Sequence, residues 1–225
     1  MSKAILAAKE QVLWGCQTMC RRGYVLGTAG NISARVEGED LFVITPTSFP
    51  YEGLSSADLV VADMNGDIVE GEKMPSIEFT MHRGIILKRP DVRCIVHTHS
   101  KFATAASSIA GVSVIPVIDI ETVIYIGGDI PIAPFAPPGS EELAENVANS
   151  MGTVAGILME AHGAVGVGRT MKEAMIASDN IERTCEMFLA IKACGEIKPL
   201  PEDFLRTFKE HSLKKRGLLY PLFGD

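Results

Sequence analysis

Two histidines placed two residues apart are the clearest chemical signal in this chain. His97 and His99 stand in the run Cys-Ile-Val-His-Thr-His at 94–99, which reads as a short buried strand entering a turn. Side chains two positions apart on a strand point to the same face, so the two imidazoles are presented together. His162 follows another apolar run, 154–159, and can supply a third nitrogen. Three histidines with one open position are typical of a catalytic zinc rather than a structural one.

Glu78 is the candidate acid/base, or the displaceable fourth ligand, beside these histidines. It falls in the first turn of a helix predicted from Ile77 to about Lys88 and capped by Ser76. The helix dipole favours a carboxylate in that turn in any protein, so position alone does not separate a catalytic role from a helix-stabilising one. His82 lies one turn later on the same face, where it can orient Glu78.

The elements that must hold these residues follow from hydrophobic periodicity. Apolar residues recur at helical spacing from Ile5 to Cys20 and predict a helix there. Asn65-Gly66 between two short apolar runs predicts a hairpin. Thr170 with Glu173 matches a capping box at the start of a long helix. Hairpins mixed with covering helices predict an α/β fold whose central, mostly antiparallel sheet is sandwiched by helices.

Composition narrows the class of protein. With 225 residues, 47% of them hydrophobic, and no linker or repeat, the chain is expected to form one domain over residues 1–225. The formal net charge of −7 argues against nucleic acid and anionic membranes as partners. No apolar run approaches the roughly 18 residues of a membrane span, and the charged start is unlike a signal peptide. The five cysteines are odd in number and scattered, which favours reduced thiols in a cytoplasmic protein.

Three further segments combine small residues with hydroxyl or amide groups. They are the glycine-rich loop from Gly27 to Asn31, the run from Thr45 to Ser48, and Ser76 at a predicted helix N-terminus. Such segments can present backbone N–H groups to a phosphate or an oxyanion, although ordinary turns have the same composition.

Taken in order, these motifs resemble the class II aldolase/adducin family, the group of fuculose-phosphate aldolase and ribulose-phosphate 4-epimerase. The order and spacing of the matching segments are far more specific than any single segment, and they run over nearly the whole chain. The resemblance implies the three-layer fold of that family. The matching segments are Gly27–Ser33, Thr45–Thr47, Pro75–Glu78, Arg89–Val92, His97–Ser100 and His162–Gly163.

The resemblance also implies a set of roles for individual residues. A divalent metal, usually zinc with manganese or cobalt as alternatives, would lie on His97, His99 and His162, with Glu78 as acid/base. The implied assembly is a homotetramer with its sites at subunit interfaces, and the implied partner is a small phosphorylated sugar. Contacts to the substrate phosphate are implied for Thr28, Gly30, Asn31, Thr47, Ser48 and Ser76.

The activity that the resemblance implies is that of a zinc-dependent aldehyde-lyase. It would reversibly cleave a ketose 1-phosphate of the fuculose, deoxyribulose or methylthioribulose type to dihydroxyacetone phosphate and an aldehyde. One departure is Ile77, which stands where these aldolases commonly have a second phosphate-binding serine. Another is Ile120, which falls at the position of their tyrosine acid. Glu121 or Tyr125 are candidates to replace that acid.

Other readings stay open. The C-terminal tyrosine that reaches a neighbouring site in the family corresponds to Tyr220, with His211 as a competitor. Within the family, methylthioribulose-1-phosphate dehydratase (with Glu121 as its acid), sugar-acid phosphate decarboxylase and ribulose-phosphate 4-epimerase are alternatives. Glu78 argues against the epimerase, which carries aspartate there. A non-enzymatic, adducin-like role is the alternative of another class, and it usually comes with lost metal ligands.

Overall fold

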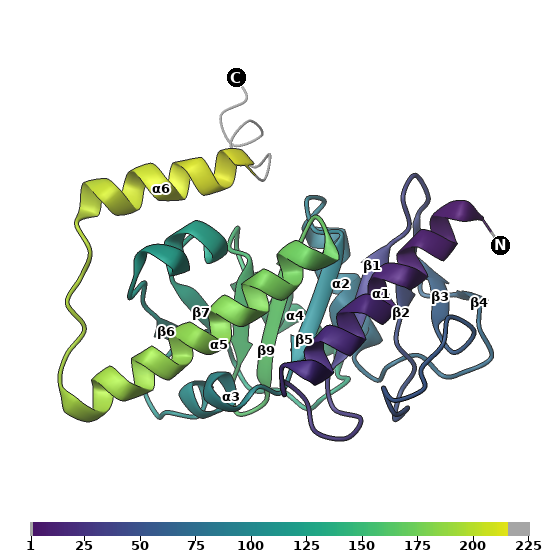
Figure 1. The fold of residues 1–225 in the computed structure, drawn as a ribbon, viewed down its shortest axis with the longest axis horizontal. Helices are drawn as coiled ribbons and strands as arrows, with labels where there is room; N and C mark the ends of the chain where they lie inside the picture. Colours follow the sequence, from purple (N-terminus) through teal and green to yellow (C-terminus); the bar gives the residue numbers. More distant parts are fainter. Residues whose placement is uncertain (1, 216–225) are drawn as a thin grey trace.

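The structure is a computed structural model that describes residues 2–215 (Figure 1). Nine strands form one open sheet in the order β4-β3-β2-β1-β5-β9-β8-β7-β6, and every pairing is antiparallel except that of β7 with β8. The predicted α/β fold with a mostly antiparallel central sheet is confirmed. The strands are β1 (Asn31–Arg35), β2 (Leu41–Ile44), β3 (Val60–Asp63), β4 (Ile68–Glu70), β5 (Cys94–Thr98), β6 (Val114–Ile115), β7 (Ile130–Ala133), β8 (Gly156–Met159) and β9 (Gly163–Gly168).

Helices cover both faces of this sheet. Within residues 2–215, no helix is long and apolar enough to cross a bilayer. In Figure 1, α1 and α5 lie across the front of the sheet, while α2 and α4 lie behind it. The helices are α1 (Lys3–Arg21), α2 (Phe79–Lys88), α3 (Lys101–Ser107), the π-helix η1 (Thr122–Ile126), α4 (Glu141–Ser150), α5 (Met171–Cys194) and α6 (Glu202–Lys215).

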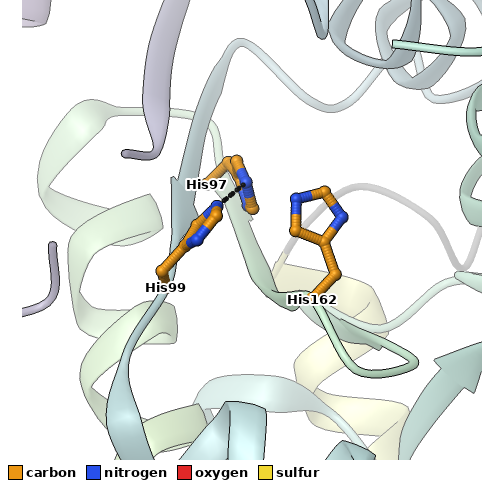
Figure 2. A group of neighbouring side chains, drawn as sticks. All are labelled: His97, His99 and His162. Carbon is orange, nitrogen blue, oxygen red and sulfur yellow. Dashed lines mark hydrogen bonds between the residues drawn. The ribbon is translucent and has the colours of Figure 1, made fainter. Parts of the chain in front are cut away.

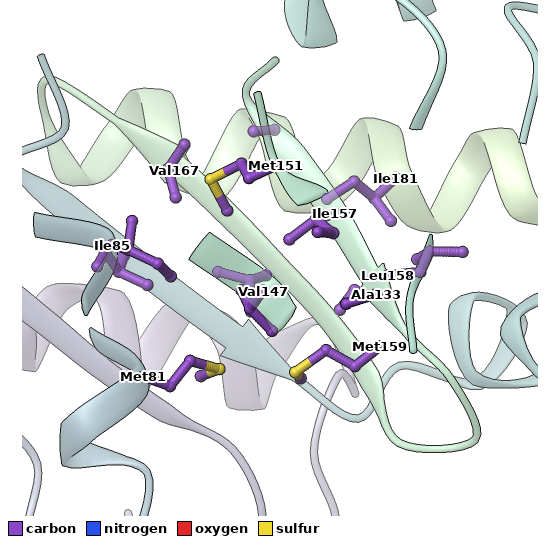
Figure 3. Close-up of a cluster of buried hydrophobic side chains, with 14 of the residues drawn as sticks. Met81, Ile85, Ala133, Val147, Met151, Ile157, Leu158, Met159, Val167 and Ile181 are labelled. Carbon is purple, nitrogen blue, oxygen red and sulfur yellow. The ribbon is translucent and has the colours of Figure 1, made fainter. Parts of the chain in front are cut away.

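The buried apolar side chains between the sheet and its helices form two clusters. On the front face, Val12 of α1 packs in one cluster with Ile32 of β1 and Val96 of β5. Figure 3 shows the larger cluster, where Met81 of α2 and other apolar side chains from α4, β8 and β9 meet. Every residue of β5 is buried, so His97 and Thr98 at its end need polar partners that the protein itself supplies.

One of the two predicted helix caps is confirmed and one is wrong. Thr170 accepts a hydrogen bond from the backbone N–H group of Glu173 at 3.1 Å, as the capping box predicts. The structure also shows a cap at α1, where Ser2 accepts from the N–H group of Ile5 at 3.1 Å. Ser76, however, is not the N-cap of α2, which begins at Phe79.

The physical reason for this later start is strand-like pairing just before the helix. Pro75 forms an antiparallel bridge with Pro46, and the N–H group of Ser76 donates to the carbonyl of Thr45 at 3.0 Å. The chain therefore stays extended through Ser76, and Glu78 becomes the residue at the N-cap position. Its side chain makes no cap hydrogen bond, so it is available to the neighbouring strands.

Candidate metal centre and active site

Antiparallel pairing of β5 with β9 brings the three histidines together. Thr98 pairs with Ala164, so the end of β5, with His97 and His99, meets the beginning of β9, next to His162. The three imidazole ring centroids are 4.8, 5.0 and 5.0 Å apart. Figure 2 shows the three rings converging from these two chain segments.

The backbone around the rings is tightly fixed. A Cβ at Gly163 would lie 2.2 Å from the carbonyl oxygen of Thr98, so only glycine allows the two strand ends to approach this closely. The N–H group of His99 donates to the carbonyl of Tyr24 at 3.0 Å. These contacts fix the backbone positions from which the His99 and His162 side chains extend.

The nitrogen atoms are arranged as metal ligands would be. His97 Nδ1 donates to the carbonyl oxygen of Ala164 at 3.0 Å, so Nε2 is the atom of His97 that would bind a metal after losing its proton. Without a metal, burial lowers the pKa of His97, but the charge of Glu78 and its hydrogen bond to Nε2 outweigh burial and raise it. His97 Nε2 and His99 Nε2 lie 3.0 Å apart, and one ligand atom from each of the three histidines lies within 4.8 Å of the others. Tetrahedral nitrogen ligands about 2.0–2.1 Å from a zinc ion stand only slightly over 3 Å apart. The donor set fits a divalent ion.

The protonation states of the His99 and His162 rings also fit a metal site. Burial, and then the charge on His97 and on His162, lower the pKa of His99 to about 4. Burial and the charge on His97 also lower the pKa of His162. Both rings are therefore neutral near pH 7, which is the state that a metal ligand requires.

Glu78 points its carboxylate into the same space. Its Oε2 atom lies 2.9 Å from His97 Nε2, and its Oε1 atom lies 3.2 Å from His162 Nε2. Burial alone would raise the pKa of Glu78, but the charge of His97 and hydrogen bonds from His97 and Asn31 outweigh burial and hold the pKa well below its usual range. Among the described residues, the buried Oε1 atom has no hydrogen-bond partner. An ionised carboxylate with one unpartnered oxygen faces the three rings.

The loops with predicted phosphate contacts gather beside Glu78. The bridge between Pro46 and Pro75 joins the second and third of these segments. The Nδ2 group of Asn31 donates to Oε2 of Glu78 at 2.9 Å, which brings the first segment to the same place. The Oγ atom of Ser76 accepts from the N–H group of Glu78 at 3.2 Å. Of the six residues, Thr28 and Ser48 are exposed, Gly30 and Thr47 are partly buried, and Asn31 and Ser76 are buried.

Within the part of the chain that the structure describes, Glu121, another predicted catalytic residue, makes its contacts at the surface and not with the histidines. Glu121 is exposed, immediately before η1, and its Oε2 atom lies 3.1 Å from Arg183 Nη1. No recorded contact within residues 2–215 joins Glu121 to the histidines. Its competitor Tyr125 is exposed on η1, and His211 is exposed on α6. Tyr220 lies outside the described residues.

Sequence reasoning missed a carboxylate that holds the helix next to His99. Glu182 of α5 accepts hydrogen bonds from the N–H groups of Phe102, at 2.9 Å, and of Ala103, at 2.8 Å. The N-cap residue of α3, Ser100, makes no such bond with its own side chain. No local signal predicts this cap, because the carboxylate and the helix are 79 and 80 residues apart.

We expect Glu182→Ala to loosen the chain next to His99. Losing the cap should lower the free energy of unfolding by about 1–2 kcal/mol, and metal affinity should fall because α3 no longer holds the end of β5. Urea unfolding and titration with zinc measure the two effects. Glu186→Ala, an exposed residue one turn further along α5, is the matched control. Equal stability and affinity in the two variants would contradict the capping role.

Comparison with known proteins assigns the chain to a family. It belongs to the family described as Class II Aldolase and Adducin N-terminal domain, which matches residues 10–189. It is similar to the L-fuculose phosphate aldolase of Escherichia coli (strain K12), with 33% identity over 210 residues, which are 91% of this chain and 95% of the relative. It is also similar to the 3-oxo-tetronate 4-phosphate decarboxylase of Haemophilus influenzae, with 32% identity over 189 residues, covering 83% of this chain and 89% of the relative.

The fold gives the same result. A solved structure of an L-fuculose 1-phosphate aldolase matches with a TM-score of 0.86 and 26% sequence identity, covering 94% of this chain and 97% of that one. The relatives thus include an aldolase and a decarboxylase, and the three-histidine cluster is consistent with the divalent metal site of class II aldolases.

Proposed function

We propose that this protein is a metal-dependent class II aldolase, an aldehyde-lyase that reversibly cleaves a ketose 1-phosphate to dihydroxyacetone phosphate and an aldehyde. The observation that carries the proposal is the buried, ionised carboxylate of Glu78, whose oxygens lie 2.9 and 3.2 Å from two of the three clustered imidazoles. Substrates of the fuculose, deoxyribulose or methylthioribulose type fit the sugar-phosphate aldolases to which the chain is similar.

The side chains of this site divide the chemistry among them. A divalent ion on the three histidines, zinc or else manganese or cobalt, would supply a Lewis acid for the substrate carbonyl. Glu78 Oε1 has no hydrogen-bond partner among the described residues, so it is the atom that we assign to proton transfer. During synthesis it takes the proton from the carbon next to the carbonyl of dihydroxyacetone phosphate, and during cleavage it returns that proton.

Binding of the phosphate is assigned to the loops beside Glu78. The formal net charge of −7 provides no general attraction for an anion, so local N–H and hydroxyl groups must hold the phosphate. We assign this role to Thr28, Gly30, Asn31, Thr47, Ser48 and Ser76.

We further propose a cytoplasmic, single-domain chain that assembles as a homotetramer with its sites at subunit interfaces. Glu121 and Tyr220 remain candidates for the acid that protonates the aldehyde oxygen. The exposure of Glu121 supports a role in a site shared between copies, because a surface carboxylate can approach the histidines of another subunit.

Decarboxylation of a sugar-acid phosphate is the second candidate function. The decarboxylase of Haemophilus influenzae is 32% identical to this chain, nearly as similar as the aldolase of Escherichia coli. Ile120, at the position of the tyrosine acid of the aldolases, also favours a reaction that does not need that acid.

The test is product formation by the metal-loaded protein. Zinc- or manganese-loaded protein is incubated with dihydroxyacetone phosphate and a panel of small aldehydes that includes lactaldehyde, acetaldehyde and a methylthio aldehyde. Mass spectrometry should then find a new ketose phosphate, and metal-free protein should form none. If metal-bound protein forms no product with any aldehyde, the aldolase proposal fails. Carbon dioxide release from 3-oxo sugar-acid phosphates then tests the second candidate.

A further inference from the structure

A buried chain of hydrogen bonds runs from β1 through α2 to the carboxylate of Glu78. The Oγ atom of Ser33 lies 2.7 Å from Nδ1 of His82, and Nε2 of His82 lies 2.6 Å from Oδ1 of Asn31. The Nδ2 atom of Asn31 donates to Oε2 of Glu78 at 2.9 Å. All four side chains are at most 5% exposed, so water does not compete for these bonds.

Which group donates in each of these hydrogen bonds follows from the bond that Asn31 makes to Glu78. Asn31 donates from its Nδ2 group to Glu78, which leaves its Oδ1 atom facing Nε2 of His82. Burial, together with the charge on His97, lowers the pKa of His82 to about 3, so this ring is neutral. Because Oδ1 only accepts, the single ring proton of His82 must be on Nε2, and Nδ1 then accepts from the hydroxyl of Ser33.

This arrangement distinguishes the two oxygens of Glu78. Rotating the Asn31 amide by half a turn would place its carbonyl oxygen against the carboxylate, and the N–H group of His82 prevents that rotation. Oε2 is therefore anchored by Asn31, next to His97 Nε2 at 2.9 Å. Oε1 lies 3.2 Å from His162 Nε2 but has no hydrogen-bond partner among the described residues. Aligned hydrogen bonds also polarise one another in a site of low dielectric constant, which strengthens the anchor.

We propose that Ser33 and His82 are positioning residues of the reaction: acting through Asn31, they hold Oε2 of Glu78 so that Oε1 is presented to the substrate. This inference rests on the proposed function. His82 is fully buried behind Asn31, and its two ring nitrogens face Ser33 and Asn31, so it acts on the carboxylate and not on the substrate. A structural role in packing α2 against β1 is the alternative.

A pair of substitutions at His82 separates positioning from packing. His82→Gln keeps an amide donor and an acceptor near the two ring nitrogens, whereas His82→Leu keeps apolar volume and removes both. We expect His82→Leu to lower kcat by about 10–100-fold, with metal content and KM within about 3-fold of wild type. His82→Gln should restore kcat to within about 5-fold of wild type. If packing is the role, the order reverses and His82→Leu retains full kcat, which would overturn the proposal.

A second pair of variants covers the case in which His82→Leu does not fold. Ser33→Ala removes only the first hydrogen bond and should lower kcat by at least about 3-fold. Ser178→Ala is the matched control, since Ser178 is also buried and its hydroxyl donates within α5 to the carbonyl of Ala174 at 3.0 Å. Equal kcat in the two variants would count against the role of Ser33.

Nitrogen NMR of the metal-free protein with isotope-labelled histidine tests the hydrogen bonds of His82 independently of catalytic activity. We expect the His82 ring to be neutral at pH 7 with its proton on Nε2, and a proton on Nδ1 or a charged ring would overturn the assignment. Failure of the proposed function and failure of the positioning proposal give different results. Absence of turnover in wild type refutes the proposed function alone, and the NMR result still decides the hydrogen-bond chain.

Discussion

The Glu78→Gln variant is expected to bind metal as wild type does and to lose about 10²–10⁴-fold in kcat, the usual contribution of a positioned acid/base. Glutamine has the shape of glutamate, and its amide oxygen can still accept the bond that Asn31 donates to Oε2, at 2.9 Å in the structure. It cannot accept a proton at neutral pH. The three histidines remain in place, so KM and metal content should change little.

Metal content by mass spectrometry and kcat and KM with the substrate from the aldehyde panel measure this result. The matched control is Glu145→Gln, which removes an exposed carboxylate from α4, the helix beside α2. A kcat within about 3-fold of wild type would exclude Glu78 as the acid/base. Loss of the metal together with activity would instead identify Glu78 as a metal ligand.

The Gly163→Ala variant is expected to lose metal binding, and with it activity, while remaining folded. Its added methyl group would lie 2.2 Å from the carbonyl oxygen of Thr98 and 3.4 Å from the Cα atom of His99. Both neighbours are backbone atoms, so the ends of β5 and β9 must separate. Separation moves His99 and His162 apart, and three-histidine sites tolerate little change in the distance between ligands.

Zinc titration of the metal-free variant and thermal unfolding measure the two parts of this prediction. We expect metal affinity to fall by at least about 100-fold and the free energy of unfolding to fall by about 1–3 kcal/mol. Gly195→Ala is the control, because nothing lies within 4 Å of its added methyl group. Wild-type zinc affinity in Gly163→Ala would show that the approach of the two strand ends does not position the metal ligands.

Local patterns in the sequence determined the elements and the kind of chemistry. Alternation on a strand placed His97 and His99 on one side because strand geometry repeats every two residues. Helical periodicity predicted α1, and the capping box predicted the start of α5, because both features depend only on residues within one or two turns. The net charge of −7 argues against nucleic acid as a partner, because charge follows from composition alone.

Local patterns failed where distant backbone decided the geometry. Ser76 has the right residue type for a helix cap, yet pairing with Thr45 keeps it extended and α2 begins later. The segment 122–126 forms a π-helix, for which the chain gave no periodic signal. In both places hydrogen bonds or packing across the molecule override local preference.

Tertiary structure alone decided how the site is assembled. The sequence contains His162 but not its distance from His97, which follows from the pairing of β5 with β9. In the same way, the chain alone does not show that Asn31 binds Glu78 and His82, nor that Glu121 lies on the surface beside Arg183. Residue types set the chemistry that is available, because donor atoms and charge are local properties. Distances between donors depend on strand register, which the whole sheet determines by burying its apolar faces together.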